Sequence, residues 1–321
     1  MHRYWRIVTH AGSIGPFAPA LQLCGLPGGV CEVRGEQKRY ATMAASSGFM
    51  IAEAERRFYM RSPSLVPTQM SHKCQGYRCA STELIRAHLT PRSFGRHVQG
   101  ESSPNLLVSQ TRYTKALPLG LYDTNILCES CDGFLNTRYD DPGFEFLKNF
   151  SSAPKKIITN GVDAYFEMGG VDCDFICLFV LSILWRYAIS TLPDASEIQL
   201  GPYQDRAREV LWGVMPLVSF AEFQVVCQQH AKGLVNTEMM YSSPVNMRGQ
   251  DFNSYGFSIL GLHFLAKVDR RPFPSIYSPF VMNGSQLLRG YFVDFHHTPQ
   301  GRGAREMLAA AGKRRGTKMQ R

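Results

Sequence analysis

The most pronounced apolar stretch of the chain lies at residues 175–185, where ten apolar side chains and one serine follow one another. Asp172 and Asp174 precede the stretch, and Arg186 follows it. Because the stretch is apolar on every side, it predicts a helix buried in a protein core over residues 174–190. It is too short to span a bilayer, which takes about 20 apolar residues.

The other patterns predict a mixture of shorter elements. Residues 203–212 are expected to form a second helix, and residues 256–265 a buried strand or a pair of strands. A final strand is expected at 291–297, and a short buried strand at 125–128. Residues 1–70 show no lasting helical or alternating period, which predicts a poorly structured extension. We therefore expect an α+β fold.

Four of the nine cysteines form two closely spaced pairs, Cys74 with Cys79 and Cys128 with Cys131. Each short turn can aim two sulfurs at one ion, and four thiolates complete a closed tetrahedral zinc site. Unrelated core cysteines and a disulfide are the alternatives. Polar residues between the paired cysteines argue against the first, and nothing in the sequence points to an oxidising compartment. The sequence therefore predicts a structural Zn²⁺ held by these four residues.

The residues between and after the cysteine pairs follow a known order. The order is a Cys pair, then His88-Leu-Thr-Pro91, then Asn125-Ile-Leu-Cys128-Glu-Ser-Cys131-Asp132. Over residues 74–141 this order resembles the HNH-type treble-clef (ββα-metal) endonucleases. The resemblance predicts a treble-clef zinc module at residues 71–150, placed before the region that holds the apolar helix.

The same resemblance implies roles for three residues. His88 matches the general base that activates water, and Asn125 matches the residue that braces the loop presenting the histidine. Asp132 matches the position that helps to hold a catalytic divalent cation, Mg²⁺ or Mn²⁺. The function implied is metal-dependent hydrolysis of phosphodiester bonds, with DNA as the substrate.

The chain departs from this family at Ala87. Active members often carry Asp or Glu directly before the histidine, and that carboxylate binds the cation. A hard cation prefers oxygen ligands, which Asp140, Asp141 or the more distant Glu83 could supply. The alternative is a catalytically inactive zinc module that binds nucleic acid or a protein partner.

The charge of the chain is concentrated at its two ends. The net charge is +9, of which residues 1–73 carry +5 and residues 302–321 carry +6, leaving −2 between them. Residues 86–115 are also basic, with five Lys or Arg and one Glu around His88. Arg92 and Arg96 are the candidates for positioning a DNA backbone, although such a loop can equally be a solvated surface.

These observations predict four segments. They are an extension at 1–70, the zinc module at 71–150, a mainly helical domain with some strands at 151–301, and a basic tail at 302–321. A later start at Met43, Met50, Met60 or Met70 would account for the extension. No clean signal peptide or membrane-spanning stretch is present, so we expect a cytoplasmic protein that does not associate with a membrane.

Overall fold

The computed structural model describes nine segments of the chain: residues 7–10, 72–99, 105–109, 115–117, 119–150, 155–159, 162–230, 241–247 and 252–293. The α-helices are α1 (Arg92–Gln99), α2 (Glu129–Leu135), α3 (Asp141–Phe150), α4 (Cys173–Ile189) and α5 (Gln204–Leu211). A π-helical turn, η2 (Asn136–Asp140), joins α2 to α3, and short 3₁₀ turns lie at η3 (Pro193–Ala195), η4 (Gly201–Tyr203), η5 (Leu217–Ser219) and η7 (Ser275–Phe280). The strands are β1 (Ile7–His10), β2 (Ala87–His88), β3 (Asn105–Ser109), β4 (Lys115–Leu117), β5 (Tyr122–Asp123), β6 (Lys155–Thr159), β7 (Val162–Gly169), β8 (Phe223–His230), β9 (Tyr241–Ser242), β10 (Val245–Asn246), β11 (Ser254–Ile259), β12 (Leu262–Val268) and β13 (Leu287–Val293).

The described strands form two sheets. The larger sheet has eleven strands in the order β4-β3-β1-β9-β11-β12-β8-β13-β7-β6, with β10 paired to β11. The smaller sheet is the antiparallel pair β2 and β5, in which Ala87 faces Asp123 and His88 faces Tyr122. Helices and sheets therefore coexist, which confirms the expected α+β class.

The region after residue 150 differs from the expectation of a mainly helical domain. Its described residues form the eight strands β6 to β13 but only two α-helices, α4 and α5. The central strand β8 was not predicted, because it is covered on both faces and shows no alternation of polar and apolar residues. Its residues Val225, Val226 and Cys227 are all buried, for example.

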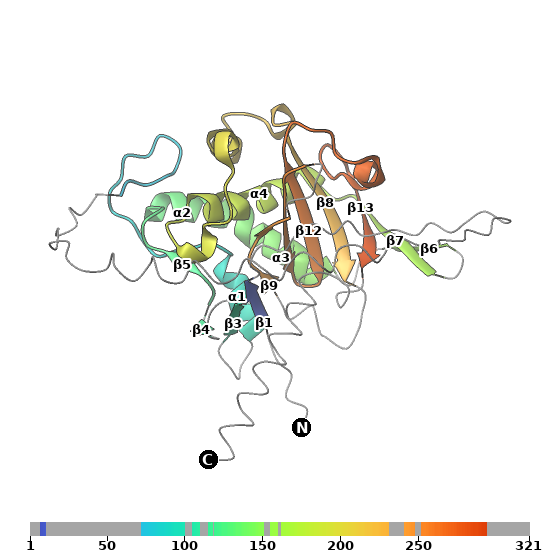
Figure 1. Ribbon diagram of the computed structural model, residues 1–321, viewed down its shortest axis with the longest axis horizontal. Coiled ribbons are helices and arrows are strands. Elements are labelled where there is room, and N and C mark those ends of the chain that lie inside the picture. The colour runs from blue at the N-terminus through green and yellow to red at the C-terminus, as the bar shows by residue number, and fades with distance from the viewer. Residues whose placement is uncertain are drawn as a thin grey trace, which may run out of the picture. The chain divides into compact units, whose positions relative to one another are not determined.

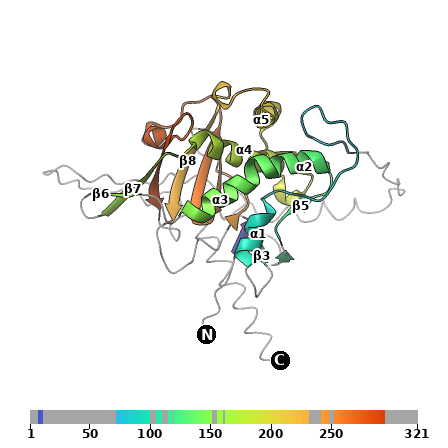
Figure 2. The same ribbon diagram turned by 180° about the vertical axis from the view of Figure 1, so that it is seen from behind.

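Alternate residues of the central strands pack into two different clusters. Val225 and Cys227 of β8 belong to the large cluster that includes α4. Val226, between them, belongs to a second cluster with Phe252, and Phe280 of η7 packs against that cluster. Successive side chains of a strand point to opposite faces, so this division shows that both faces of the sheet are covered. Figure 2 shows the helices that cover the first of these faces, with α3 and α4 lying over β8.

The helix α4 is the buried helix that the sequence predicts. Asp172 is its N-cap, and its carboxylate accepts a hydrogen bond from the backbone N–H of Phe175 at 3.0 Å. The second predicted helix is confirmed as α5. None of the helices in the described part of the chain is long and apolar enough to cross a membrane.

The predicted pair of strands at 256–265 is confirmed as β11 and β12. They are joined by a two-residue turn in which both Leu260 and Gly261 have positive φ angles, 47° and 86°. Turns of this kind match the twist of paired strands. The final strand is confirmed only as far as Val293, and residues 294–297 lie outside the described residues.

Of the strand predicted at 125–128, residues 126–128 are buried, but the segment does not form a strand. Their carbonyl groups are used elsewhere: Ile126 accepts from the N–H of Gln75, and Leu127 accepts from that of Ile85. These bonds connect the segment to the first cysteine pair instead of to a neighbouring strand.

At the N-terminus, residues 7–10 form β1, which pairs in parallel with β3 and β9 and which the sequence did not predict. The other residues of the predicted extension, and the basic tail at 302–321, lie outside the described residues.

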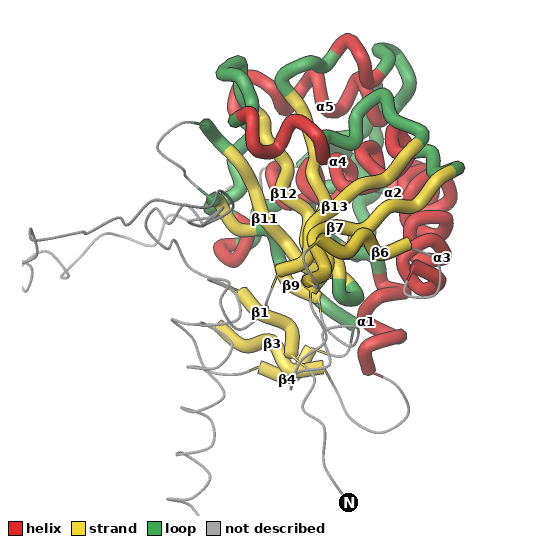
Figure 3. The backbone as a smooth tube through the Cα atoms, turned by 90° about the vertical axis from the view of Figure 1, so that its right-hand side faces the viewer, coloured by secondary structure: helices red, strands yellow, loops and turns green. Residues whose placement is uncertain are grey.

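The residues on the two sides of position 150 share one hydrophobic core. The large cluster contains Phe94 and Leu135 from the first part of the chain and Phe179 and Leu184 from α4. Figures 1 and 3 show α2, α3 and α4 gathered on one side of β12 and β13. The cysteine-containing segment is therefore packed directly on α4.

Candidate functional site

The four predicted cysteines meet at one point. Cys74 and Cys79 come from the loop before β2, Cys128 directly precedes α2, and Cys131 lies in its first turn. Their Sγ atoms all lie within 4.8 Å of one another, and the Sγ atoms of Cys79 and Cys128 are 3.6 Å apart. In a tetrahedral zinc site the sulfurs are about 3.8 Å apart, because each Zn–S bond is about 2.3 Å long.

The local backbone favours metal binding over a disulfide. All four cysteines are free thiols. The Cys74 Sγ accepts hydrogen bonds from the N–H of Gly76 at 3.4 Å and of Cys128 at 3.3 Å, which stabilise a thiolate. Burial and the neighbouring Cys74 sulfur raise the pKa of the Cys131 thiol, since crowded sulfurs cannot all be negative without a cation. These four residues could therefore hold a structural metal ion such as zinc. In the described part of the chain, no second group of three metal-ligating side chains comes together.

His88 lies on β2, which follows the first cysteine pair along the chain. Its side chain is partly buried, and its ring centroid is 6.1 Å from that of Tyr122 on β5. Burial lowers the pKa of His88 to about 4, and four positively charged neighbours lower it further: Arg92, Arg186, Arg86 and Arg96. His88 is therefore a neutral imidazole at neutral pH.

Three of these four arginines are exposed, and the fourth is buried. Arg92 and Arg96 lie four residues apart on α1, so both can face the same side of the helix. The Arg86 guanidinium stacks 3.9 Å above the Tyr122 ring centroid and donates to the Tyr122 hydroxyl at 2.9 Å. The exposed face beside His88 is therefore strongly positive.

Asn125 contacts the end of α4. Its side-chain amide donates to Thr191 Oγ1 at 3.2 Å, and its backbone N–H donates to the carboxylate of Asp123 at 2.9 Å. Asp123 also accepts from the Thr191 N–H at 2.6 Å and from the Ser190 hydroxyl at 2.8 Å. Asn125 thus lies in a network that fixes the loop after β5 to α4.

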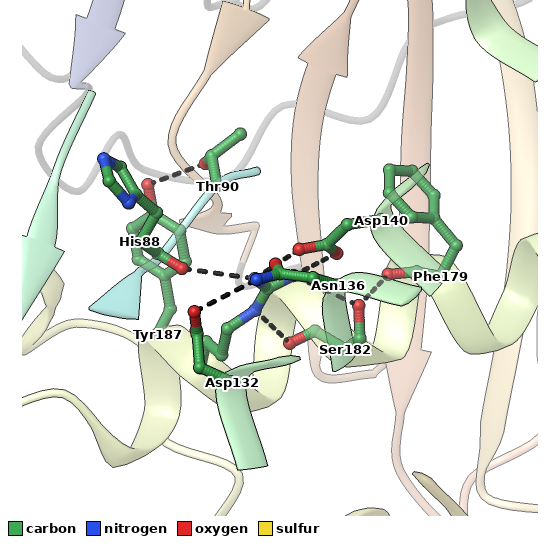
Figure 4. Close-up of polar contacts among 9 residues, drawn as sticks. His88, Thr90, Asp132, Asn136, Asp140, Phe179, Ser182 and Tyr187 are labelled. Atoms are coloured by element: carbon green, nitrogen blue, oxygen red, sulfur yellow. Dashed lines mark hydrogen bonds and ion pairs between the residues drawn. The ribbon is translucent and has the colours of Figure 1, made fainter. Parts of the chain in front are cut away.

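Asp132 is only 9% exposed and lies on the inner side of α2. Its Oδ2 accepts from the Asn136 side chain at 3.0 Å, whereas its Oδ1 has no hydrogen-bond partner in the described structure. Burial raises the pKa of Asp132, and the positive charge of Arg186 opposes that rise. Figure 4 shows the imidazole of His88 pointing away from the Asp132 carboxylate. The structure therefore does not bring these two side chains together as a pair of cation ligands.

The other carboxylates considered as ligands are placed differently. Asp140 is buried in an ion pair with Arg186, and Asp141 is exposed on α3. Glu83 is exposed in the loop before β2.

The sequence analysis missed the role of Arg186. Its guanidinium forms two bonds with the Asp140 carboxylate, at 2.6 and 2.8 Å, and donates to the backbone oxygen of His88 at 3.2 Å. A lone arginine between Trp185 and Tyr187 near the end of an apolar helix was the available signal. A charge on a buried helix needs an opposite charge or several acceptors.

Comparisons of the chain with protein-family models, with curated proteins and with solved structures found no match.

Proposed function

We propose that the chain is an HNH-like nuclease that hydrolyses phosphodiester bonds in DNA, with a zinc-stabilised module presenting His88 as the general base. The observation that carries this proposal is the surroundings of His88. A partly buried, neutral imidazole lies on β2, within the segment bracketed by the two cysteine pairs, and next to the exposed cations Arg92 and Arg96. A base that acts at neutral pH must be unprotonated, and a phosphate must be bound next to it.

The order of the elements supports the resemblance to the treble-clef family. A cysteine-bearing loop is followed by β2 and, after α1, β3 and β4, by its antiparallel partner β5. The helix α2 comes next, with Cys128 at its N-cap and Cys131 in its first turn. His88 lies on the first strand of this ββα arrangement, where the resemblance expects the base. The four cysteines would bind Zn²⁺ and hold the loop, the strands and the helix together.

In the proposed reaction His88 accepts a proton from water as the water oxygen bonds to phosphorus. The bond from phosphorus to the leaving sugar oxygen breaks, and that oxygen takes up a proton from solvent. Arg92 and Arg96 bind the phosphate oxygens and orient the scissile bond. A bound phosphodiester also carries a negative charge, which offsets the nearby arginines. This charge would raise the pKa of His88 from about 4 toward the range in which a base is most effective.

The resemblance also implies a catalytic Mg²⁺ or Mn²⁺, and the described residues fit such an ion poorly. The unpartnered Oδ1 of Asp132 is the one feature in favour. Against it, Asp132 is buried near Arg186, and the carboxylate expected before the histidine is replaced by Ala87, which is 0% exposed. The proposed steps therefore involve His88 and the arginines alone.

A plasmid-nicking assay tests the proposal. The full chain should nick supercoiled DNA in reactions run with and without added Mg²⁺ or Mn²⁺, and His88→Ala should abolish nicking while keeping zinc, melting temperature and DNA affinity. General-base assistance is typically worth about 100- to 10,000-fold in rate. His72→Ala, which removes an exposed histidine, is the matched control. An active wild type with an equally active His88→Ala would refute the mechanism.

The alternative is a zinc module that binds nucleic acid or a protein without catalysis. Two observations favour it, namely the buried Ala87 and the inward orientation of Asp132. A chain that nicks no DNA with either cation would support this alternative. Measuring the binding affinity at several salt concentrations then distinguishes a nucleic-acid partner from a protein partner. For a nucleic-acid partner, Arg92→Ala should weaken binding and reduce the slope of log K against log salt by about 1.

A further inference from the structure

We propose that Arg186 is a positioning residue for His88, and that Asp140 on η2 holds the Arg186 side chain in place for this task. The proposal rests on the proposed function, because it concerns the residue that would act as the base. It assigns part of the site to α4, which lies outside the cysteine-containing segment.

The hydrogen bonds of Arg186 leave none of its donors free. A guanidinium has five N–H donors. Nη1 donates to Asp140 Oδ2 at 2.8 Å and to the His88 carbonyl at 3.2 Å, and Nη2 donates to Asp140 Oδ1 at 2.6 Å and to Ser182 Oγ at 3.4 Å. Nε donates to the Ser182 carbonyl at 3.2 Å. Since Arg186 is also 0% exposed, it does not bind phosphate and acts on the site only through His88.

The contact places the guanidinium on the backbone of His88 and leaves the imidazole free. Figure 4 shows the His88 carbonyl directed into the network around Asp140 while its ring points out of that network. A histidine held by its carbonyl keeps both ring nitrogens available for chemistry. The position of the His88 backbone, from which the ring projects, is fixed by a buried and fully bonded group.

The next residue of α4 holds the other side of the same turn. The Tyr187 hydroxyl forms a hydrogen bond with Thr90 Oγ1 at 3.2 Å, and Thr90 is buried. Arg186 and Tyr187 therefore hold residues 88 and 90 on either side of Leu89, which is 0% exposed. Asp123 ties β5, the partner strand, to Thr191 at the end of α4. Both strands of the small sheet are thus attached to one helix.

A π-helical turn presents Asp140 to this network. Residues Asn136–Asp140 form η2 between α2 and α3, and Asp140 is buried at its end. A π turn adds a residue to the helical repeat and changes the direction of the side chains that follow, and such turns are frequent at functional sites. Here the turn places the Asp140 carboxylate where it neutralises the buried positive charge of Arg186.

Three variants of the full chain test the positioning role. Arg186→Lys keeps the positive charge, but a single ammonium cannot reproduce the planar fork that bonds Asp140 and the His88 carbonyl together. The double variant Asp140→Leu with Arg186→Met replaces the ion pair by apolar side chains, a change that buried pairs often tolerate without loss of stability. Arg206→Lys is the matched control, because Arg206 likewise bonds a carboxylate (Glu222, 2.8 Å) and a backbone carbonyl (Ser219, 2.7 Å).

The expected results separate positioning from stability. The double variant and Arg186→Lys should keep zinc, melting temperature and the KM for plasmid DNA, while kcat for nicking falls about 10- to 100-fold. Arg206→Lys should keep wild-type kcat. A stable double variant that nicks at the wild-type rate would overturn the proposal.

A second measurement does not depend on nicking. The N–H of Leu89 donates to the Leu121 carbonyl at 3.0 Å, directly after β2. Its hydrogen exchange should become at least about tenfold faster in Arg186→Lys and remain unchanged in Arg206→Lys. Equal exchange in all variants would overturn the positioning role even if the double variant lost stability. If the wild type nicks no DNA, the proposed function fails, and the Leu89 exchange alone decides whether Arg186 positions β2.

Discussion

The Cα atom of Gly76 lies against the sulfur of Cys131, so that a methyl group added at position 76 would overlap the Cys131 Sγ. Gly76 comes from the first cysteine loop, and Cys131 lies in the first turn of α2. The two cysteine pairs can therefore approach one another only because residue 76 has no side chain.

This relationship predicts that Gly76→Ala impairs metal binding. The added methyl group must push the Cys131 sulfur away from the other three thiols, so we expect less than one zinc per chain and a lower melting temperature. Atomic absorption and thermal unfolding measure the two effects. Gly133→Ala in α2 is the control, because nothing lies within 4 Å of its added methyl group, and it should be neutral or stabilising by up to about 1 kcal/mol. Full zinc occupancy in Gly76→Ala would mean that the four cysteines do not share one ion.

The sequence predicted those elements whose stability depends on local patterns. The helix α4 was predictable from an unbroken apolar run that follows an aspartate cap, Asp172. The cluster of four cysteines was predictable because two closely spaced cysteine pairs are typical of metal binding. The two strands at 254–268 were also predictable as a buried pair. In each case the signal lies within a few neighbouring residues.

The parts that the sequence did not predict depend on contacts between distant residues. The strand β8 pairs in parallel with β13 some 60 residues later, and no local pattern reports such a pairing. The partnership of Arg186 with Asp140 and the His88 carbonyl likewise joins segments separated by 46 and 98 residues. The family pattern predicted Asp132 as a cation ligand, but the structure does not bring its carboxylate together with His88, and the buried charge of Arg186 lies near it instead.

A second prediction concerns Ala87, where members of the family that the sequence resembles often have a carboxylate. Ala87 is 0% exposed and faces Asp123 across the small sheet, and Asp123 is itself buried. Ala87→Asp would bury a second carboxylate opposite the first, so the free energy of unfolding should fall by about 2–4 kcal/mol in urea titrations. Val218→Asp, at a site that is 83% exposed, should change it by less than about 0.5 kcal/mol. Unchanged stability, together with nicking at lower Mg²⁺ concentrations, would instead mean that position 87 faces a cation.

The last prediction uses the pH dependence of stability to test the surroundings of His88 without measuring activity. Burial and the nearby arginines lower the pKa of His88 to about 4 in the folded chain, against 6.5 for an ordinary histidine. Between these two values the unfolded state binds one more proton at this residue than the folded state. The folded state therefore loses stability as the pH falls from 6.5 to 4, at a rate of at most about 1.4 kcal/mol per pH unit.

His88→Gln removes this titration while keeping a polar side chain, so its free energy of unfolding should decline less steeply than that of the wild type between pH 6.5 and 5. Protonation of the cysteines and release of metal also reduce stability at low pH, but they affect both chains equally and cancel in the difference. Parallel curves for wild type and His88→Gln would show that His88 takes up its proton equally in both states. In that case the imidazole would not lie in the partly buried, positively charged environment on which its role as a base depends.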